Sequence, residues 1–148
     1  MSAVEELKNI LQNIIHEPTQ FPEDGNLAFL TVGRVGRLKH PGALDFGGSE
    51  YAEAEVEWLE PEPQAEDDKY GWWNLEPGTY QVEFNEGISL SENSGVLLQI
   101  WAQALKAGVT HPTAVITDSV NPLSTLLHVG NAGVGIKENA RLSEVRLI

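Results

Sequence analysis

The sequence predicts a mainly β fold, an antiparallel barrel or sandwich with a short N-terminal helix. Two patterns predict the strands: an alternation of apolar and polar residues near the middle of the chain, and several further short apolar runs separated by turns. Closely spaced short strands of this kind are typical of barrels and sandwiches. A third pattern, apolar residues at helical spacing, lies near the start. With 148 residues, the chain is most simply one domain, 1–148.

The alternating segment is the clearest strand. Polar residues separate the members of an apolar series, which is the period of a strand with one buried face. A Pro-Gly turn at 77–78 leads into the segment and a Ser-Gly turn at 94–95 follows it. The series consists of Tyr80, Val82, Phe84, Ile88 and Leu90.

Shorter elements complete the predicted barrel core, residues 75–148. Each is a short apolar run bounded by turn residues. They are an apolar run at 96–100, a helical turn at 102–107 that ends at Gly108, strands at 114–116 and 123–129, a turn at 130–133 and a closing strand at 142–148.

The N-terminal segment 1–16 is predicted to be a helix that packs on its own sheet, in preference to a partner-binding helix. From Ser2 onward, apolar residues recur at intervals of three and four, which forms one apolar stripe. Ser2 and Glu5 have the spacing of a capping box, and Pro18 is expected to end the helix.

Two further strands are predicted before the core, at 27–35 and 51–59. In the second, Glu53, Glu55 and Glu57 alternate with apolar residues. Carboxylates could bind a hard cation, but neighbours on one face of a strand lie nearly 7 Å apart, so a solvated face is preferred. Residues 61–71 are predicted to form an acidic surface loop.

Composition excludes several functions. The formal charge of −13 disfavours a nucleic-acid partner, because phosphate contacts need a basic surface. The chain has no cysteine, so thiolate metal sites are excluded. No apolar run is long enough to span a membrane, and we expect no membrane partner. The first residues lack a basic signal-peptide region, so a cytoplasmic location is expected.

One segment concentrates positive charge. Arg34, Arg37 and Lys39 are three of the nine basic residues, and they lie at the end of the predicted strand at 27–35 and just beyond it. The simpler interpretation is a strand end whose charges face water. The alternative is an anion or partner site, although the segment lacks the P-loop pattern.

Two motifs of the core resemble the dUTPase and dCTP deaminase superfamily. The first is Leu75-Glu76-Pro77-Gly78-Thr79-Tyr80; the second is His111-Pro112-Thr113-Ala114, followed by Asp118 and then Asn131 at the family spacing. The resemblance implies a dUTPase-like distorted antiparallel β-barrel of the β-clip type. It also implies a homotrimer with sites between subunits, and hydrolase or deaminase activity in nucleotide metabolism. Asp45 matches an early family Asp that mainly supports the fold.

The reactive positions of the family have changed in this chain. Its phosphate-clamping Arg-Ser-Ser becomes Trp101-Ala102-Gln103, while Lys106 keeps the charge of a second family Arg. Asn121 replaces the aromatic residue that stacks on the sugar, and Leu123 replaces a Gly beside it. His128 stands at the position of the deaminase Glu. A tryptophan cannot replace a bidentate cation.

We therefore favour a degenerate family member, a pseudoenzyme with a weak nucleotide or small-ligand pocket between subunits. Ligand-binding candidates are Trp101, Gln103, Lys106, Asn121, Arg34 and Arg37. One alternative is a diverged pyrimidine nucleotide hydrolase or deaminase in which Asp118 or His128 is the catalytic base. Another is a structural protein whose cleft is filled. No metal site and no cofactor are expected, with Mg²⁺ bound only alongside a nucleoside triphosphate.

Overall fold

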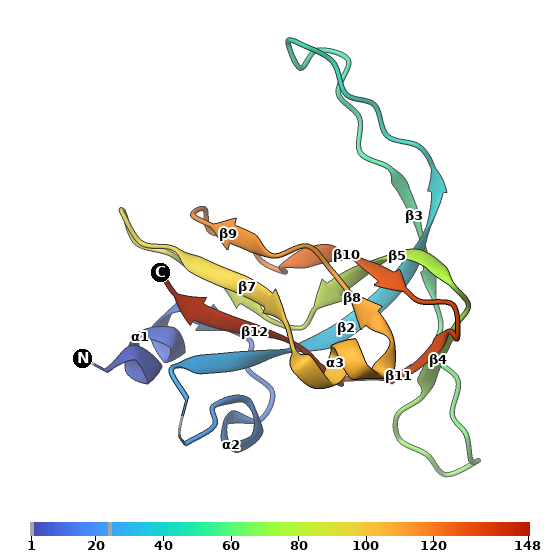
Figure 1. Ribbon diagram of the computed structural model, residues 1–148, viewed down its shortest axis with the longest axis horizontal. Helices are drawn as coiled ribbons and strands as arrows, with labels where there is room; N and C mark the ends of the chain where they lie inside the picture. The colour runs from blue at the N-terminus through green and yellow to red at the C-terminus, as the bar shows by residue number, and fades with distance from the viewer. Residues whose placement is uncertain (1, 24) are drawn as a thin grey trace.

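The computed structural model describes residues 2–23 and 25–148 and shows a curled antiparallel half-barrel (Figure 1). Seven strands follow one another in the order β8-β10-β5-β2-β12-β7-β9, and β3 joins the sheet through β2. All strand pairs of the described residues are antiparallel. The predicted mainly β fold with a short N-terminal helix is confirmed.

Strand β2 (Leu27–His40) is the centre of this sheet. Its first half pairs with β12 (Arg141–Leu147), and its second half pairs with β5 (Gly78–Phe84) and β3 (Glu55–Leu59). The central strand of the sheet therefore precedes the segment 75–148 that was predicted as the barrel core. The remaining strands are β1 (Leu11–Gln12), β4 (Trp72–Leu75), β6 (Gly87–Ile88), β7 (Val96–Ile100), β8 (Val109–Thr110), β9 (Ala114–Ile116), β10 (Ser124–Val129) and β11 (Val134–Lys137).

Most predicted elements after residue 78 are confirmed. The helical turn is α3 (Ala102–Ala107), and Gly108 ends it with a left-handed φ of 110°. Strands β7 and β9 have the predicted bounds. The predicted strand at 51–59 is shorter, because only 55–59 pair continuously with β2. Strands β4 and β11, which pair with each other, were not predicted.

The N-terminal segment differs from the prediction of one helix over 1–16. Helix α1 spans only Ala3–Ile10, because Leu11 leaves the helix to pair with Ile88. Pro18 does not end that helix; it lies in the first turn of α2 (Glu17–Gln20), where its missing N–H has no intrahelical partner to lose. The capping box of Ser2 and Glu5 is confirmed, and Leu7 packs into the core.

The concave face of the sheet carries the core. Val82 and Phe84 from β5 are buried there with Leu127 from β10 and Val35 from β2. Phe84 is 1% exposed, and burial of such a side chain contributes about 1.5–3 kcal/mol. The alternation predicted between residues 80 and 90 thus places its apolar members inward.

A long arm leaves the barrel between β2 and β3. Residues 41–54 form this arm, which extends away from the sheet in Figure 1. A bridge between Ala43 and Ala52 closes its base. At its tip, the Asp45 carboxylate accepts hydrogen bonds from the backbone N–H groups of Gly48 and Glu50, at 3.0 and 2.9 Å. The tip is therefore shaped by its own hydrogen bonds.

The helices of the described chain are all short. None of them is long and apolar enough to cross a lipid bilayer.

Candidate functional site

A pocket of about 250 Å³ lies where α3 meets β11 and β12. Two of the predicted ligand-binding residues, Trp101 and Gln103, line it. Apolar side chains form most of its wall, and two cationic residues complete it. Besides Trp101 and Gln103, the lining includes Trp72, Val109, Ile136, Lys137, Ala140 and Arg141.

Trp101 is held in place by a stack of side chains. Its ring meets the Phe29 ring edge-on, with centroids 5.0 Å apart. The Arg141 guanidinium lies 4.6 Å from the Trp101 centroid and 5.1 Å from the Phe29 centroid. A cation over an aromatic face is attracted by the ring electrons. The position at which the resemblance places an arginine clamp is thus a tryptophan with a guanidinium beside it.

The pocket is positive in an otherwise acidic chain. Lys137 and Arg141 line the pocket, and Lys106 lies on α3, the helix that borders it. Among residues 2–23 and 25–148, none of these three cations forms an ion pair. No carboxylate lines the pocket, so these residues favour an anion and do not fit Mg²⁺, which prefers oxygen ligands.

Arg34 and Arg37 lie elsewhere, on β2. The Arg34 guanidinium donates to both carboxylate oxygens of Glu83, at 2.8 and 3.1 Å, and stacks 3.8 Å from the Trp58 ring centroid. The hydrogen bond to Glu83 raises the pKa of Arg34. Arg37 lies 3.8 Å from Glu57. The charge of Arg34 is therefore balanced within the sheet.

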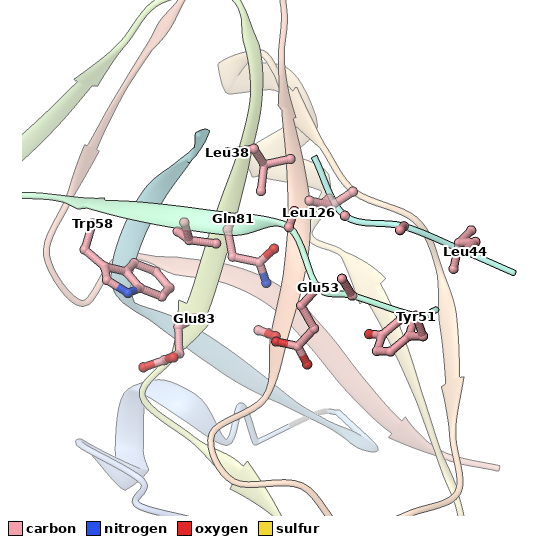
Figure 2. Close-up of a pocket in the computed structure, with 14 residues that line it drawn as sticks. Leu38, Leu44, Tyr51, Glu53, Trp58, Gln81, Glu83 and Leu126 are labelled. Carbon is pink, nitrogen blue, oxygen red and sulfur yellow. The ribbon is translucent and has the colours of Figure 1, made fainter. Parts of the chain in front are cut away.

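Trp58 and Glu83, the partners of Arg34, line a second hollow, on the convex face of the sheet (Figure 2). The strand register aligns Trp58, Gly36, Gln81 and Leu126 across four strands, and this row forms the floor of the groove. The arm forms its upper wall, and the volume is about 640 Å³. Glu53 and Glu83 give the groove acidic character, so it suits an anionic ligand less well than the smaller pocket does.

Asp118 and Asn121 lie far from the pocket in the same protomer. Asp118 is exposed two residues beyond β9, whereas Trp101 follows the opposite end of the paired strand β7. At the usual rise per residue, their separation is on the order of 20 Å. The Asn121 side chain accepts a hydrogen bond from the Asn13 amide, at 3.3 Å. Leu123 is buried in the core.

His128 occupies a third place, on β10. Its Nδ1 lies 3.0 Å from the Thr79 hydroxyl of the neighbouring strand. The ring is exposed beside a shallow hollow of about 280 Å³ that also contains Leu105 and Thr110. Within the described chain, no hydrogen bond joins it to Asp118. One protomer therefore does not unite the two predicted catalytic residues.

The sequence analysis missed a buried carboxylate, Glu86. It accepts hydrogen bonds from the Thr31 backbone N–H, the Thr31 hydroxyl and the Gln20 amide, at 2.8, 2.6 and 3.0 Å. Burial raises the pKa of Glu86. A signal was present, because Glu86 falls in the same phase as the inward residues Phe84 and Ile88. Its role is to tie α2 to β2.

His111 lies in the loop between β8 and β9 and is buried, with 4% exposed. Its Nδ1 lies 2.9 Å from the Pro112 carbonyl and its Nε2 lies 2.6 Å from the Ser143 hydroxyl. A carbonyl can only accept, so Nδ1 donates and the neutral Nε2 accepts from Ser143. Burial lowers the pKa of His111, and we assign it a structural role.

The chain is similar to known proteins in sequence and in structure, and no family model matches it. A protein named "Probable deoxyuridine 5'-triphosphate nucleotidohydrolase" from Methanococcoides burtonii is 27% identical over 138 residues, which cover 92% of this chain and 76% of the relative. The crystal structure of 2'-deoxycytidine 5'-triphosphate deaminase from Agrobacterium tumefaciens matches with a TM-score of 0.64 at 14% identity.

The structural match covers 98% of this chain but only 46% of the deaminase chain. At that identity it establishes the fold alone. The nucleotidohydrolase is similar to this chain in sequence, over 92% of its length. Together with the half-barrel of antiparallel strands, these likenesses support the predicted resemblance to the dUTPase and dCTP deaminase superfamily.

Proposed function

We propose that this chain is a catalytically degenerate superfamily member that binds a nucleotide or a similar aromatic anion in the pocket of Trp101 and Arg141. One observation carries the proposal: the Arg141 guanidinium, which has no ion-pair partner among residues 2–23 and 25–148, lies 4.6 Å from an aromatic ring in a pocket that no described carboxylate lines. An aromatic ring can stack on a nucleobase, and the cations can meet its phosphates. The ligand-binding residues are Trp101, Gln103, Arg141 and Lys137, with Lys106 at the rim.

The lack of efficient chemistry follows from what surrounds this pocket. General acid–base catalysis needs a titratable group within hydrogen-bond reach of the reacting atoms. Within one protomer no Asp, Glu or His lines the pocket, and Asp118 is on the order of 20 Å away. Each lost charge-assisted contact removes about 1.5–3 kcal/mol, so replacement of an Arg-Ser-Ser clamp should weaken triphosphate binding strongly.

We also propose that the chain forms a homotrimer, in which a neighbouring copy borders the pocket. The likeness to the superfamily supports this assembly, as does the exposed arm at 41–54. Light scattering after size-exclusion chromatography would measure the mass directly. A monomer at micromolar protein concentration would contradict the proposal.

Turnover and binding assays test the functional proposal separately. Incubation with dUTP and dCTP, with and without Mg²⁺, should release neither diphosphate nor ammonia at the rate of an efficient enzyme. A thermal shift with dUMP, dUTP and dCTP should show stabilisation, because a ligand bound only by the folded state raises its stability. Deoxyribose alone should not produce a shift. Rapid turnover would refute degeneracy, and no shift at millimolar nucleotide would refute the pocket.

One contact supports a second candidate, a diverged enzyme with His128 as base. The Thr79 hydroxyl lies 3.0 Å from the His128 Nδ1, which is the geometry of a nucleophile beside its base. If a pyrimidine nucleotide is turned over, His128→Asn should abolish the activity. Loss of activity in Asp118→Ala alone would instead assign the base to Asp118.

A further inference from the structure

The arm at 41–54 presents large apolar side chains that nothing in the protomer covers. Leu44 is 90% exposed, Phe46 is fully exposed and Tyr51 is 56% exposed. No arm residue belongs to the core cluster. The Asp45 hydrogen bonds nevertheless give the tip a defined shape. A shaped apolar tip of this kind is typical of an interaction site.

The charge of the arm restricts its partner. Residues 41–54 contain Asp45, Glu50 and Glu53 and no basic residue. Most of the surface of this chain is also acidic and would repel the arm. The surface around the pocket at α3 and β11 is different, since Lys137 and Arg141 line that pocket without any carboxylate. The acidic arm and the basic pocket are therefore electrostatically complementary.

The same two surfaces are complementary in apolar character. The pocket of about 250 Å³ is lined by Trp72, Trp101, Val109 and Ile136. It has room for one aromatic side chain, and Phe46 is the most exposed large apolar residue of the arm. The arm and α3 lie well apart in Figure 1. The matching surfaces can therefore meet only between two molecules.

We propose that the arm of one copy docks on a second copy of this chain, with Phe46 inserted into the pocket of Trp101 and Arg141. The arm carboxylates then face Lys106, Lys137 and Arg141 of that second copy. Because arm and pocket are different surfaces, the contact is head-to-tail, and repetition of one rotation closes it into a ring.

The arm tip supplies the centre of the proposed interface but not its whole buried area. An aromatic side chain buries about 150–250 Å², so Leu44, Phe46 and Tyr51 together supply roughly half of the 800 Å² that each partner buries in a standard interface. The flanks of the arm supply the remainder. Phe46 is then the central anchor of the contact, the place where aromatic hot spots concentrate.

Docking would also regulate the pocket. Phe46 of one copy and a nucleotide would compete for the same space beside Trp101, so nucleotide binding would release the arm. This consequence rests on the proposed function, whereas the arm contact itself does not.

Disulfide trapping tests the contact directly, because the chain contains no cysteine. The double variant Gly47→Cys/Ala107→Cys keeps Phe46 and places one thiol beside it at the arm tip and one on the exposed pocket rim of α3. The control Gly47→Cys/Val115→Cys moves the second thiol to β9, where Val115 is 64% exposed. Mild oxidation should yield a ladder of covalent oligomers, with cross-links between residues 47 and 107, for the first variant only. Equal cross-linking of both variants, or none of the first, would overturn the proposal.

The mass of the assembly in solution gives an independent test, without any introduced cysteine. Phe46→Ser should weaken self-association about thirtyfold or more, the size expected for a central aromatic hot spot. Val115→Ser should leave association unchanged. Sedimentation of both variants checks this, and equal association of the two would overturn the contact.

Nucleotide binding to Phe46→Ser separates the two proposals. If the arm and the nucleotide compete, dUMP should bind this variant more tightly than the wild type. If the variant dissociates but binds no nucleotide, the arm contact stands and the proposed function fails. If dUMP binds equally to the wild type and to a dissociated variant, the competition is refuted and the contact alone stands.

Discussion

The Glu86 carboxylate accepts hydrogen bonds from both the backbone N–H and the hydroxyl of Thr31, at 2.8 and 2.6 Å. A buried carboxylate is stable only when its oxygens are satisfied. The Gln20 amide satisfies it further, at 3.0 Å. No cation contacts this group in the described chain, so desolvation dominates and its pKa is raised.

The raised pKa of Glu86 predicts a pH-dependent stability. The native state favours the protonated form, so the contribution of Glu86 is fully present below the ordinary Glu pKa of about 4.3 and is lost as pH rises through the raised value. Glu86→Gln should therefore flatten the decline in the free energy of unfolding above that point. Urea unfolding from acid to neutral pH would measure it. Parallel profiles of variant and wild type would contradict the prediction, and Glu138→Gln, a partly buried site, provides the comparison.

The lowered pKa of His111 predicts the opposite dependence of stability on pH. Its lowered pKa means that the native state favours the neutral ring, so its contribution is present above the ordinary His pKa of about 6.5 and is lost as pH falls below that value. His111→Ala should cost about 1–3 kcal/mol at neutral pH, because the Ser143 hydroxyl loses its acceptor. The penalty should shrink in acid. The exposed His40, changed to Ala, should have little effect on unfolding at either pH.

Gly36 is predicted to be required for the packing of β3 on β2. A Cβ there would lie 2.3 Å from the Val56 side chain and 3.0 Å from the Trp58 ring. Gly36→Ala should destabilise the protein by about 1–3 kcal/mol through overpacking. Chemical denaturation followed by tryptophan fluorescence measures this. Gly47→Ala is the control, since nothing lies within 4 Å of its added Cβ. Equal stability of both variants would refute the close packing.

Arg141 and Arg146 lie on the same strand but differ in their partners. Arg141 lies over Trp101, whereas Arg146 is 3.4 Å from Glu144. Arg141→Gln should weaken dUMP binding roughly 10–100-fold, the loss typical of one charge-assisted contact. Arg146→Gln should leave the affinity unchanged. Isothermal titration checks both, and an equal effect of the two changes would remove the pocket from the proposed function.

Much of the fold could be predicted because local patterns and tertiary structure agree. The alternation around Val82 and Phe84 marks a strand whose one face is buried, and Gly108 ends α3 because it accepts a left-handed backbone. The motif from Leu75 to Tyr80 was enough to indicate the superfamily. These signals depend on neighbours in the sequence, so no tertiary contact was needed to find them.

Other features could not be predicted because residues distant in the sequence decide them. Leu11 leaves a favourable helix because Ile88 offers a strand partner, and Trp73 is placed in β4 by Ile136. Arg141 next to Trp101 was not foreseen either, since forty positions separate them.

The sequence by itself determined that this chain is an antiparallel β protein that resembles the dUTPase and dCTP deaminase superfamily, and that Trp101 stands where this resemblance places the arginine of a phosphate clamp. Only the tertiary structure decided that Arg34 is paired with Glu83, that Glu86 and His111 are buried, and that the Arg141 guanidinium lies over the Trp101 ring. The physical reason is that the spacing of apolar residues along a strand indicates which of its faces is buried. The residue that pairs with a charged side chain depends instead on which strands lie side by side in the folded sheet.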